Sequence, residues 1–219
     1  MRLSVLIPVY NEARSVAGLI ERVKAVPVNK EIVVVDDCSK DGTGDVLRSI
    51  PGIRLFAHER NQGKGSAIRT ALSHASGDVV IIQDADLEYD PAEYPAILAP
   101  FSTPGVDAVY GSRFRGDSQF LFLSKMANYF LTCLTNLLFG GRITDMETCY
   151  KAIRRPLFQS LGLTADRFEI EPEITAKLLR RRCRIAEVPI RYRARTEGKK
   201  IGAKDGVMAC WFLAKWYVK

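Results

Sequence analysis

The chain has 219 residues, of which 47% are hydrophobic and 26% are charged, and its formal net charge is +7. This length fits one α/β domain, and the composition excludes a disordered or low-complexity protein. The positive charge favours phosphate-bearing or membrane partners. Because no zinc-finger spacing, basic zipper or aromatic RNA-binding motif accompanies it, we expect no nucleic-acid partner.

Short apolar runs alternate with helical patterns along the first half of the chain. Five runs rich in Val and Ile predict strands, at residues 3–9, 31–37, 53–58, 78–83 and 106–110. Apolar residues at helical spacing predict a helix after each of the first three runs, and Ser39 is the expected cap of the second helix. Because the strands lack polar alternation, we expect a Rossmann-like, mostly parallel sheet flanked by helices on both faces.

Polar and acidic clusters follow three of the predicted strands. They are Tyr10-Asn11-Glu12, Asp36-Asp37 and Asp84-Ala85-Asp86. Ligands of such sheets bind beyond the carboxyl ends of the strands. We therefore expect the three clusters to converge on one rim and to form a binding site there.

Asp84 and Asp86 stand two residues apart at the end of a buried run, so both carboxylates can turn toward one cation. Hard oxygen ligands predict Mg²⁺ or Mn²⁺ bridging a diphosphate, whose leaving charge the ion would neutralise. Glu88 is a third candidate ligand, and a surface role fits it equally well. A solvated acidic loop is the alternative for the pair.

The stretch Gly63-Lys64-Gly65-Ser66 lacks the spacing of a P-loop, so that interpretation fails. Its glycines permit close backbone approach at a helix start, and Lys64 is a candidate phosphate ligand. A plain helix cap is the alternative.

Two segments of the second half are unusually apolar. Residues 119–140 are too polar, and residues 211–218 too short, for a membrane span of about 20 apolar residues. Aromatic residues beside lysine are typical of a membrane interface, so we expect amphipathic interfacial helices, with packing on the sheet as the alternative. Between residues 177 and 200 there are ten Lys or Arg and two acidic residues, which indicates an anion-binding region or a solvated face.

Ordered motifs from residue 3 to about 206 carry a family resemblance. They are LSVLIPVYNE, EIVVVDDCSKDGT, NQGKGSAI, GDVVIIQDADLEYDP, VYGSRF, TDMETCYKAI, FEIEPEITAKL and EGKKIGAKDG. Together they resemble family 2 glycosyltransferases of GT-A fold, in the branch of dolichol-phosphate mannose synthases and bacterial polyprenyl-phosphate glycosyltransferases. The resemblance implies one catalytic domain over residues 1–219, with a nucleotide-sugar-binding half at 1–116 and an acceptor-binding half at 117–219.

The resemblance also implies roles for the candidate residues. The donor nucleotide would be held by Pro8, Tyr10, Asn11, Glu12, Asp36, Asp37, Lys64, Asp84, Ala85 and Asp86. The metal ligands would be Asp84 and Asp86, with Glu88 standing where the mannose synthases commonly carry Gln. Donor or acceptor phosphates would meet Arg113, Arg195 and Lys200, with Arg191 and Arg193 as alternatives to Arg195.

Asp145 matches the acceptor-side carboxylate of the family, and it joins Asp86 and Arg113 as a predicted catalytic residue. A hydroxyl acceptor needs a general base, whereas a phosphate acceptor is already ionised. Asp145 therefore acts either as a base or as an orienting residue, and Glu147 is the neighbouring candidate. Glu169 and Glu171 fit the start of a helix beside Pro172, a structural interpretation that we favour.

The implied activity is metal-dependent, inverting transfer of a hexose from a nucleoside diphosphate to a polyprenyl or dolichyl phosphate at a membrane surface. GDP-mannose is the favoured donor and UDP-glucose the next. Five cysteines without CxxC spacing fit a cytoplasmic protein. We expect it to be peripheral to the cytoplasmic face of a membrane, and a membrane anchor subunit is a further candidate partner.

Three alternatives stay open. A family 2 transferase can act on a glycan or another hydroxyl acceptor. A nucleotidyltransferase would normally carry a Gly-rich basic loop after its first strand, where this chain has VYNEARS. A non-catalytic basic membrane-binding module would not need the Asp84 and Asp86 pair.

Overall fold

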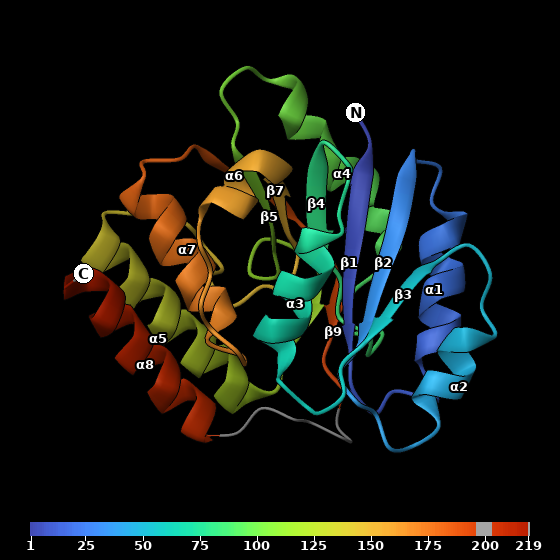
Figure 1. Cartoon of the computed structure of the whole chain (residues 1–219). Coiled ribbons are helices and arrows are strands. Elements are labelled where there is room, and N and C mark those ends of the chain that lie inside the picture. Colours follow the sequence, from blue (N-terminus) through green and yellow to red (C-terminus); the bar gives the residue numbers. More distant parts are fainter. Residues whose placement is uncertain (196–202, 219) are drawn as a thin grey trace.

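The computed structural model describes residues 1–195 and 203–218, which form a mixed α/β structure (Figure 1). The strands are β1 (Leu3–Val9), β2 (Lys30–Asp36), β3 (Arg54–Ala57), β4 (Val79–Ile82), β5 (Ala108–Ser112), β6 (Ser118–Gln119), β7 (Lys151–Arg154), β8 (Ile185–Pro189) and β9 (Tyr192–Arg193). The helices are α1 (Val16–Ala25), α2 (Thr43–Arg48), α3 (Lys64–Ser73), α4 (Tyr94–Leu98), α5 (Phe122–Phe139), α6 (Arg155–Ser160), α7 (Ile170–Arg180) and α8 (Ala203–Val218), and short 3-10 turns flank α4.

The central sheet has seven strands in the order β3-β2-β1-β4-β7-β5-β8. Four of its neighbouring pairs are parallel, and β7 runs antiparallel to both β4 and β5. The expected mostly parallel sheet is therefore confirmed, and the five predicted strands lie in it. Sequence patterns did not predict β7 or β8, because β7 is short and begins with a lysine and β8 carries a glutamate.

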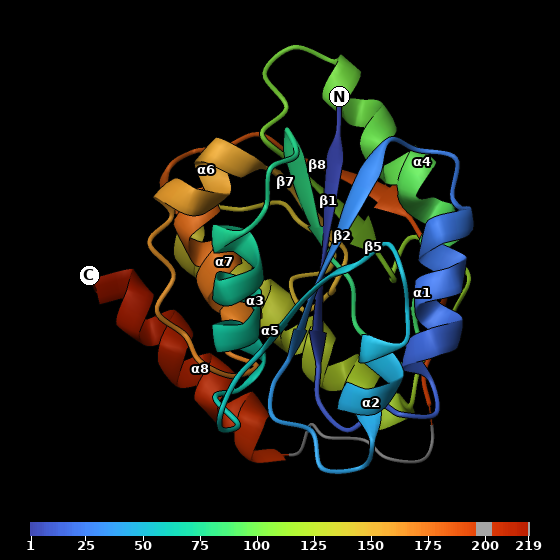
Figure 2. The same ribbon diagram turned by 45° about the vertical axis from the view of Figure 1, so that its right-hand side comes forward.

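Helices cover both faces of this sheet (Figures 1 and 2): α3, α6 and α7 lie on one face, and α1, α2 and α4 on the other. The apolar residues of α1 that recur at helical spacing are all fully buried. The expected cap of the second helix is wrong. α2 begins at Thr43 after Gly42, whose φ of 89° suits glycine, and the Ser39 hydroxyl instead accepts a hydrogen bond from Asn11.

Helices α5 and α8 lie side by side at the outside of α7, far from the centre of the sheet (Figure 1). α5 turns Leu131, Thr132 and Thr135 inward. The large apolar side chains that the two helices expose are Phe122, Leu123, Met126, Tyr129, Phe130, Leu137, Met208, Trp211, Tyr217 and Val218. No helix in the described ranges is long and apolar enough to cross a membrane.

Candidate active site

The carboxyl ends of β1, β2 and β4 lie at one edge of the sheet, because these neighbouring strands are parallel. Hydrogen bonds connect the segment after β1 to the segment after β2. The backbone N–H of Asn11 donates to Ser39 Oγ at 2.9 Å, and that of Glu12 donates to Thr43 Oγ1 at 2.9 Å. Asn11 has a φ of 52°, a left-handed conformation that asparagine tolerates. The predicted clusters are therefore neighbours in space.

Asp36, the last residue of β2, and Asp37, which follows it, are both buried but differ in what they contact. Asp37 is buried, and its carboxylate accepts hydrogen bonds from the backbone N–H of Gln62 (2.8 Å) and Gly63 (2.7 Å) while also contacting His58 Nδ1 (2.7 Å). Asp37 thus holds the start of α3. Asp36 accepts one bond from the Ser39 backbone at 3.0 Å, and is the better placed of the two for the predicted nucleoside contact.

The glycines around Lys64 serve internal packing. A Cβ atom on Gly63 would collide with the backbone of Asp166, and one on Gly65 with the backbone of Ala165. Only glycine therefore lets the start of α3 lie against this loop, which precedes α7. The close backbone approach expected from the sequence is present, and the approaching group is the protein itself.

A chain of alternating charges runs inward from this rim. Lys64 Nζ lies 2.8 Å from Asp84 Oδ1 and 3.0 Å from Glu171 Oε1. The other oxygen of Glu171 pairs with Lys151, whose ammonium also donates to the Thr148 carbonyl. Lys151 is completely buried. Burial alone would lower the pKa of Lys64, but Asp84 and Glu171 raise it well above its usual value, so Lys64 is a fixed cation.

Glu171 and Lys151 are site residues that sequence reasoning missed. The sequence favours a helix start for Glu171, and the residue does lie in the first turn of α7. The available signal was Lys151 itself, a lysine inside the apolar strand β7, because a buried lysine requires a carboxylate partner. Lys64 was predicted to meet a phosphate, and in the structure its partners are carboxylates.

Asp86 is crowded by negative charge. Burial, with the neighbouring carboxylates of Asp84 and Glu88, raises the pKa of Asp86 to about 7. Leu87, between the two acidic residues, has a φ of 63°, an uncommon and strained conformation for a leucine. Within residues 1–195 and 203–218, no three His, Cys, Asp or Glu side chains converge as a metal site.

A divalent cation nevertheless fits the chemistry of this rim. Asp84 and Asp86 offer hard carboxylate oxygens, which suit Mg²⁺ or Mn²⁺. Cations link further carboxylates to this pair. Lys64 contacts both Asp84 and Glu171, and Arg195 contacts both Asp86 and Glu12. Glu88 accepts a hydrogen bond from the Arg195 backbone N–H. Burial and the charges of Asp84 and Glu88 raise the pKa of Asp86, and a bound cation would offset this cost of ionising it.

Arg195 reaches the rim from the C-terminal part of the chain. Its Nη1 lies 3.0 Å from Glu12 Oε1, and its Nη2 lies 3.9 Å from Asp86 Oδ2. Arg195 therefore connects the loop after β1 with the loop after β4. By contrast, Arg191 pairs with Glu93 and Arg193 with Asp117 at the surface. Lys200 lies outside the described residues.

Arg113 and Asp145 form a buried pair. Arg113 Nε and Nη2 each lie 2.8 Å from an oxygen of Asp145, and the Arg113 backbone N–H donates to the same carboxylate at 2.9 Å. The guanidinium carbon lies 5.4 Å from the Phe120 ring centre and 5.1 Å from that of Tyr192. Because Asp145 is completely buried and bidentate to Arg113, the geometry favours an orienting role over a general base.

Glu147 lies close to this pair and to Lys151. Burial raises the pKa of Glu147 to about 7, although Lys151 opposes the shift. Its Oε1 atom is buried without a hydrogen-bond partner among the described residues. Such an atom is costly unless a ligand or proton satisfies it, so Glu147 stays a candidate beside Asp145.

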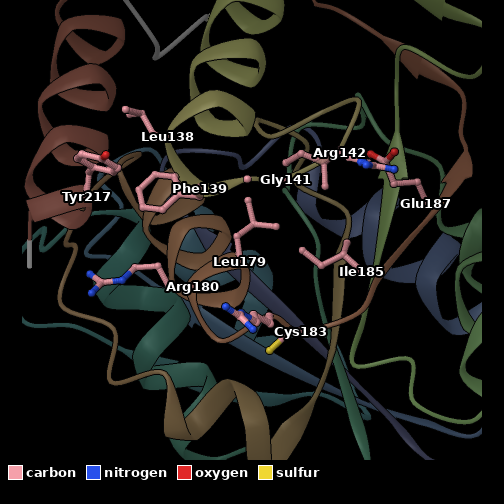
Figure 3. A pocket seen from close by; sticks show the side chains of 13 residues that line it. Leu138, Phe139, Gly141, Arg142, Leu179, Arg180, Cys183, Ile185, Glu187 and Tyr217 are labelled. Carbon is pink, nitrogen blue, oxygen red and sulfur yellow. The ribbon is translucent and has the colours of Figure 1, made fainter.

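A cavity of about 720 Å³ lies elsewhere, at the C-terminal ends of α5, α7 and α8 (Figure 3). Apolar side chains such as Phe139, Leu179 and Tyr217 line it together with Arg142 and Arg180. None of the described candidate residues borders this cavity, so the predicted chemistry lies at the rim and not here.

Comparison with known proteins places the chain in a family. The family model described as glycosyl transferase family 2 matches residues 4–162. The chain is 31% identical, over 94% of its length, to the undecaprenyl-phosphate 4-deoxy-4-formamido-L-arabinose transferase of Edwardsiella ictaluri, and covers 63% of that protein. It is 27% identical, over 90% of its length, to the dodecaprenyl-phosphate galacturonate synthase of Rhizobium johnstonii, and covers 61% of it. The chain thus spans about three fifths of these relatives.

The fold is shared with glucosyl-3-phosphoglycerate synthase of Mycobacterium tuberculosis. Its structure with Mn²⁺, uridine diphosphate and phosphoglyceric acid superposes with a TM-score of 0.78 over 98% of this chain and 78% of that chain, at 22% identity. At this identity the likeness shows the fold alone, and it confirms the expected GT-A type α/β fold.

Proposed function

The chain belongs to glycosyl transferase family 2, and on that premise we propose that it transfers a sugar from a nucleoside diphosphate to a polyprenyl phosphate, with inversion at the anomeric carbon. Two relatives are named for transfer to undecaprenyl phosphate and for synthesis on dodecaprenyl phosphate. Because the chain spans only part of each, the acceptor is proposed by this similarity. We place the reaction at the cytoplasmic face of a membrane, with peripheral association.

The rim at the ends of β1, β2 and β4 supports the donor side of the proposal. Asp84 and Asp86 would hold Mg²⁺ or Mn²⁺, an ion that, when bound, neutralises charge on a leaving diphosphate. Asn11, Glu12 and Asp36 stand where the nucleoside would lie. The fold neighbour in Mycobacterium tuberculosis holds Mn²⁺ together with uridine diphosphate.

Cations near the rim support an anionic acceptor. A polyprenyl phosphate is already ionised, so its attack needs a positioned cation more than a general base. We propose that Arg195 meets phosphate directly and that Asp145 orients Arg113 and accepts no proton. Lys200 remains a predicted phosphate ligand.

The outer faces of α5 and α8 support binding to a lipid surface. Leu123 and Leu137 on α5 are 80% and 81% exposed, and Trp211 and Tyr217 on α8 are 55% and 58% exposed. These side chains lie on two helices that contact each other, and large exposed apolar surfaces mark interaction sites. Aromatic residues with Lys215 among them fit the interfacial region of a bilayer.

The donor is proposed as a nucleoside-diphosphate sugar, and its base and sugar are decided by assay. The sequence-based preference for GDP-mannose finds no support in the relatives, whose names specify other sugars, and the fold neighbour holds uridine diphosphate. We therefore propose a uridine-diphosphate sugar as the first donor and GDP-mannose as the second.

The observation that carries the proposal is the crowded Asp84 and Asp86 pair at the sheet edge of a family 2 chain. The experiment incubates the protein with UDP-glucose or GDP-mannose, Mn²⁺ and a short polyprenyl phosphate in detergent, and detects lipid-linked sugar by mass spectrometry. We expect product from one donor, and none after Asp86→Asn or with chelator. Product on a hydroxyl acceptor but not on the lipid would replace the acceptor, and nucleotide binding without transfer to either would indicate a non-catalytic module.

A further inference from the structure

Glu88 accepts three hydrogen bonds from the segment that contains β9. Its Oε2 accepts a hydrogen bond from the Tyr192 hydroxyl at 2.8 Å, and its Oε1 accepts one from the Arg195 backbone N–H at 2.8 Å. Its own carbonyl accepts a third from the Arg193 backbone at 3.1 Å. Both carboxylate oxygens and the backbone of Glu88 therefore hold residues 192–195.

The neighbouring rings strengthen this attachment. Tyr89 and Tyr192 form an isolated β-bridge, and their ring centres lie 5.2 Å apart. Tyr192 is 6% exposed, so its hydroxyl has left water and depends on Glu88 as its acceptor. Burial and the negative charge of Glu88 raise the pKa of Tyr192, which keeps the phenol protonated as a donor.

The attachment fixes the place from which the Arg195 side chain extends. From that point the guanidinium reaches Glu12, 183 positions away in sequence, at 3.0 Å, and Asp86 at 3.9 Å. Holding an arginine side chain between two carboxylates costs rotamer entropy, and a backbone that is already anchored adds no backbone entropy to that cost. Glu88 thus fixes the backbone from which a cation reaches the rim.

We propose that Glu88 is not a metal ligand but the positioning residue that holds residues 192–195 on the metal loop and so places Arg195 between Glu12 and Asp86. Metal coordination by Glu88 would have to displace or share the bonds from two ordered donors at 2.8 Å, whereas the bond that Asp86 Oδ1 accepts from the Glu88 backbone N–H is longer, at 3.2 Å. The consequence for the proposed function, on which this step rests, is that Glu88 affects the nucleotide only through Arg195.

The first test separates coordination from positioning without measuring turnover. Mn²⁺ binding in the absence of nucleotide is followed by the electron paramagnetic resonance of free Mn²⁺, and backbone amide exchange at residues 193–195 is followed by mass spectrometry. In Glu88→Ala we expect less than about threefold change in Mn²⁺ affinity and at least roughly tenfold faster exchange, because a bond to a charged acceptor is lost. Asp86→Asn is the matched control and should weaken Mn²⁺ binding about tenfold or more.

Two results would overturn the inference. One is a loss of Mn²⁺ affinity in Glu88→Ala as large as that in Asp86→Asn. The other is unchanged amide exchange at residues 193–195. If the unmodified protein binds no Mn²⁺, the metal assignment in the proposed function fails, and the exchange measurement alone still decides the role of Glu88.

A double-mutant cycle tests the route through Arg195. The affinities for UDP and GDP with Mn²⁺ are measured by calorimetry for Glu88→Ala, Arg195→Ala and the double variant. We expect Glu88→Ala to weaken the nucleotide that binds, and to have no further effect once Arg195 is already alanine. Equal losses in both backgrounds would mean that Glu88 contacts the nucleotide or its ion directly, and would contradict the positioning role.

Discussion

The buried carboxylate of Glu31 and the half-buried carboxylate of Asp86 lie at opposite edges of the central sheet, and their surroundings differ in charge. At the amino edge, Glu31 accepts hydrogen bonds from Ser4 Oγ (2.6 Å), the Ser76 backbone (2.6 Å) and Arg54 (3.0 Å). Burial alone would raise the pKa of Glu31, but these bonds outweigh it and lower the pKa to about 2. At the carboxyl edge, burial and two neighbouring carboxylates raise the pKa of Asp86 to about 7.

The difference separates a structural charge from a functional one. A carboxylate whose donors are all supplied by the protein stabilises the fold when ionised, as at Glu31. A carboxylate crowded by others costs free energy when ionised, and a fold keeps it where a ligand cation offsets that cost. The amino edge should therefore govern stability and the carboxyl edge activity.

The largest expected effect is on turnover at the carboxyl edge. Asp86→Asn removes a proposed metal ligand, so sugar transfer should fall by about 10³-fold or more, while the melting temperature does not fall because a repelled charge is removed. Transfer to lipid and thermal unfolding are measured together. Glu31→Gln is the control at the opposite edge and should retain turnover below its melting temperature. Full activity in Asp86→Asn would contradict the view that the carboxyl edge governs activity.

The next largest effect is a loss of folding stability at the carboxyl edge, where Lys151 pairs with Glu171. Lys151→Met leaves Glu171 with an unpaired buried oxygen, and breaking a buried ion pair costs about 3–5 kcal/mol. Denaturant unfolding measures this loss, and Lys125→Met, an exposed lysine, should change stability by less than about 0.5 kcal/mol. Equal values for the two variants would show that the buried charge chain contributes nothing to the fold.

At the amino edge the effect is smaller and depends on pH. The pKa of Glu31 is depressed from 4.5 to about 2, so its ionised form stabilises the fold fully above about pH 4.5, and that contribution disappears as the pH falls toward 2. Glu31→Gln should therefore cost about 2–3 kcal/mol at pH 7 and much less at pH 2.5. Chemical unfolding at both pH values checks this, and a loss that is the same at both would refute the assignment.

The smallest expected effect is at Glu147, whose pKa shift is opposite in sign to that of Glu31. Its pKa is raised from 4.5 to about 7, so the stability it contributes is present below pH 4.5 and is lost as the pH rises to 7. Since the residue as a whole is only partly buried, Glu147→Gln should stabilise the protein by about 1–2 kcal/mol at pH 8 and leave it unchanged at pH 4. A variant less stable at pH 8 would mean that Glu147 is ionised and paired.

Sequence patterns predicted the structural features that depend on residues close together in the chain. The strands β1 to β5, the helix α1 and the aspartates at the strand ends all follow from local periodicity and position. The contacts that complete the rim are not local. Glu88 meets Arg195 from 107 positions away, and nothing in the run DADLEYD indicates that its third acidic residue faces a distant strand. β7 went unpredicted for a local reason, because it has only four residues and begins with a lysine.

The position of β7 between β4 and β5 has a consequence for synthesis on the ribosome. The first 82 residues contain β1 to β4, but the free edge of β4, with four fully buried apolar residues, acquires its partner only when Lys151–Arg154 emerges. At roughly 5–20 residues per second, that edge stays open for about 3–14 s. An open apolar strand edge is a template for pairing with other chains. Nascent chains of this protein are therefore most prone to aggregate in that interval, when chaperones would bind the open edge of β4.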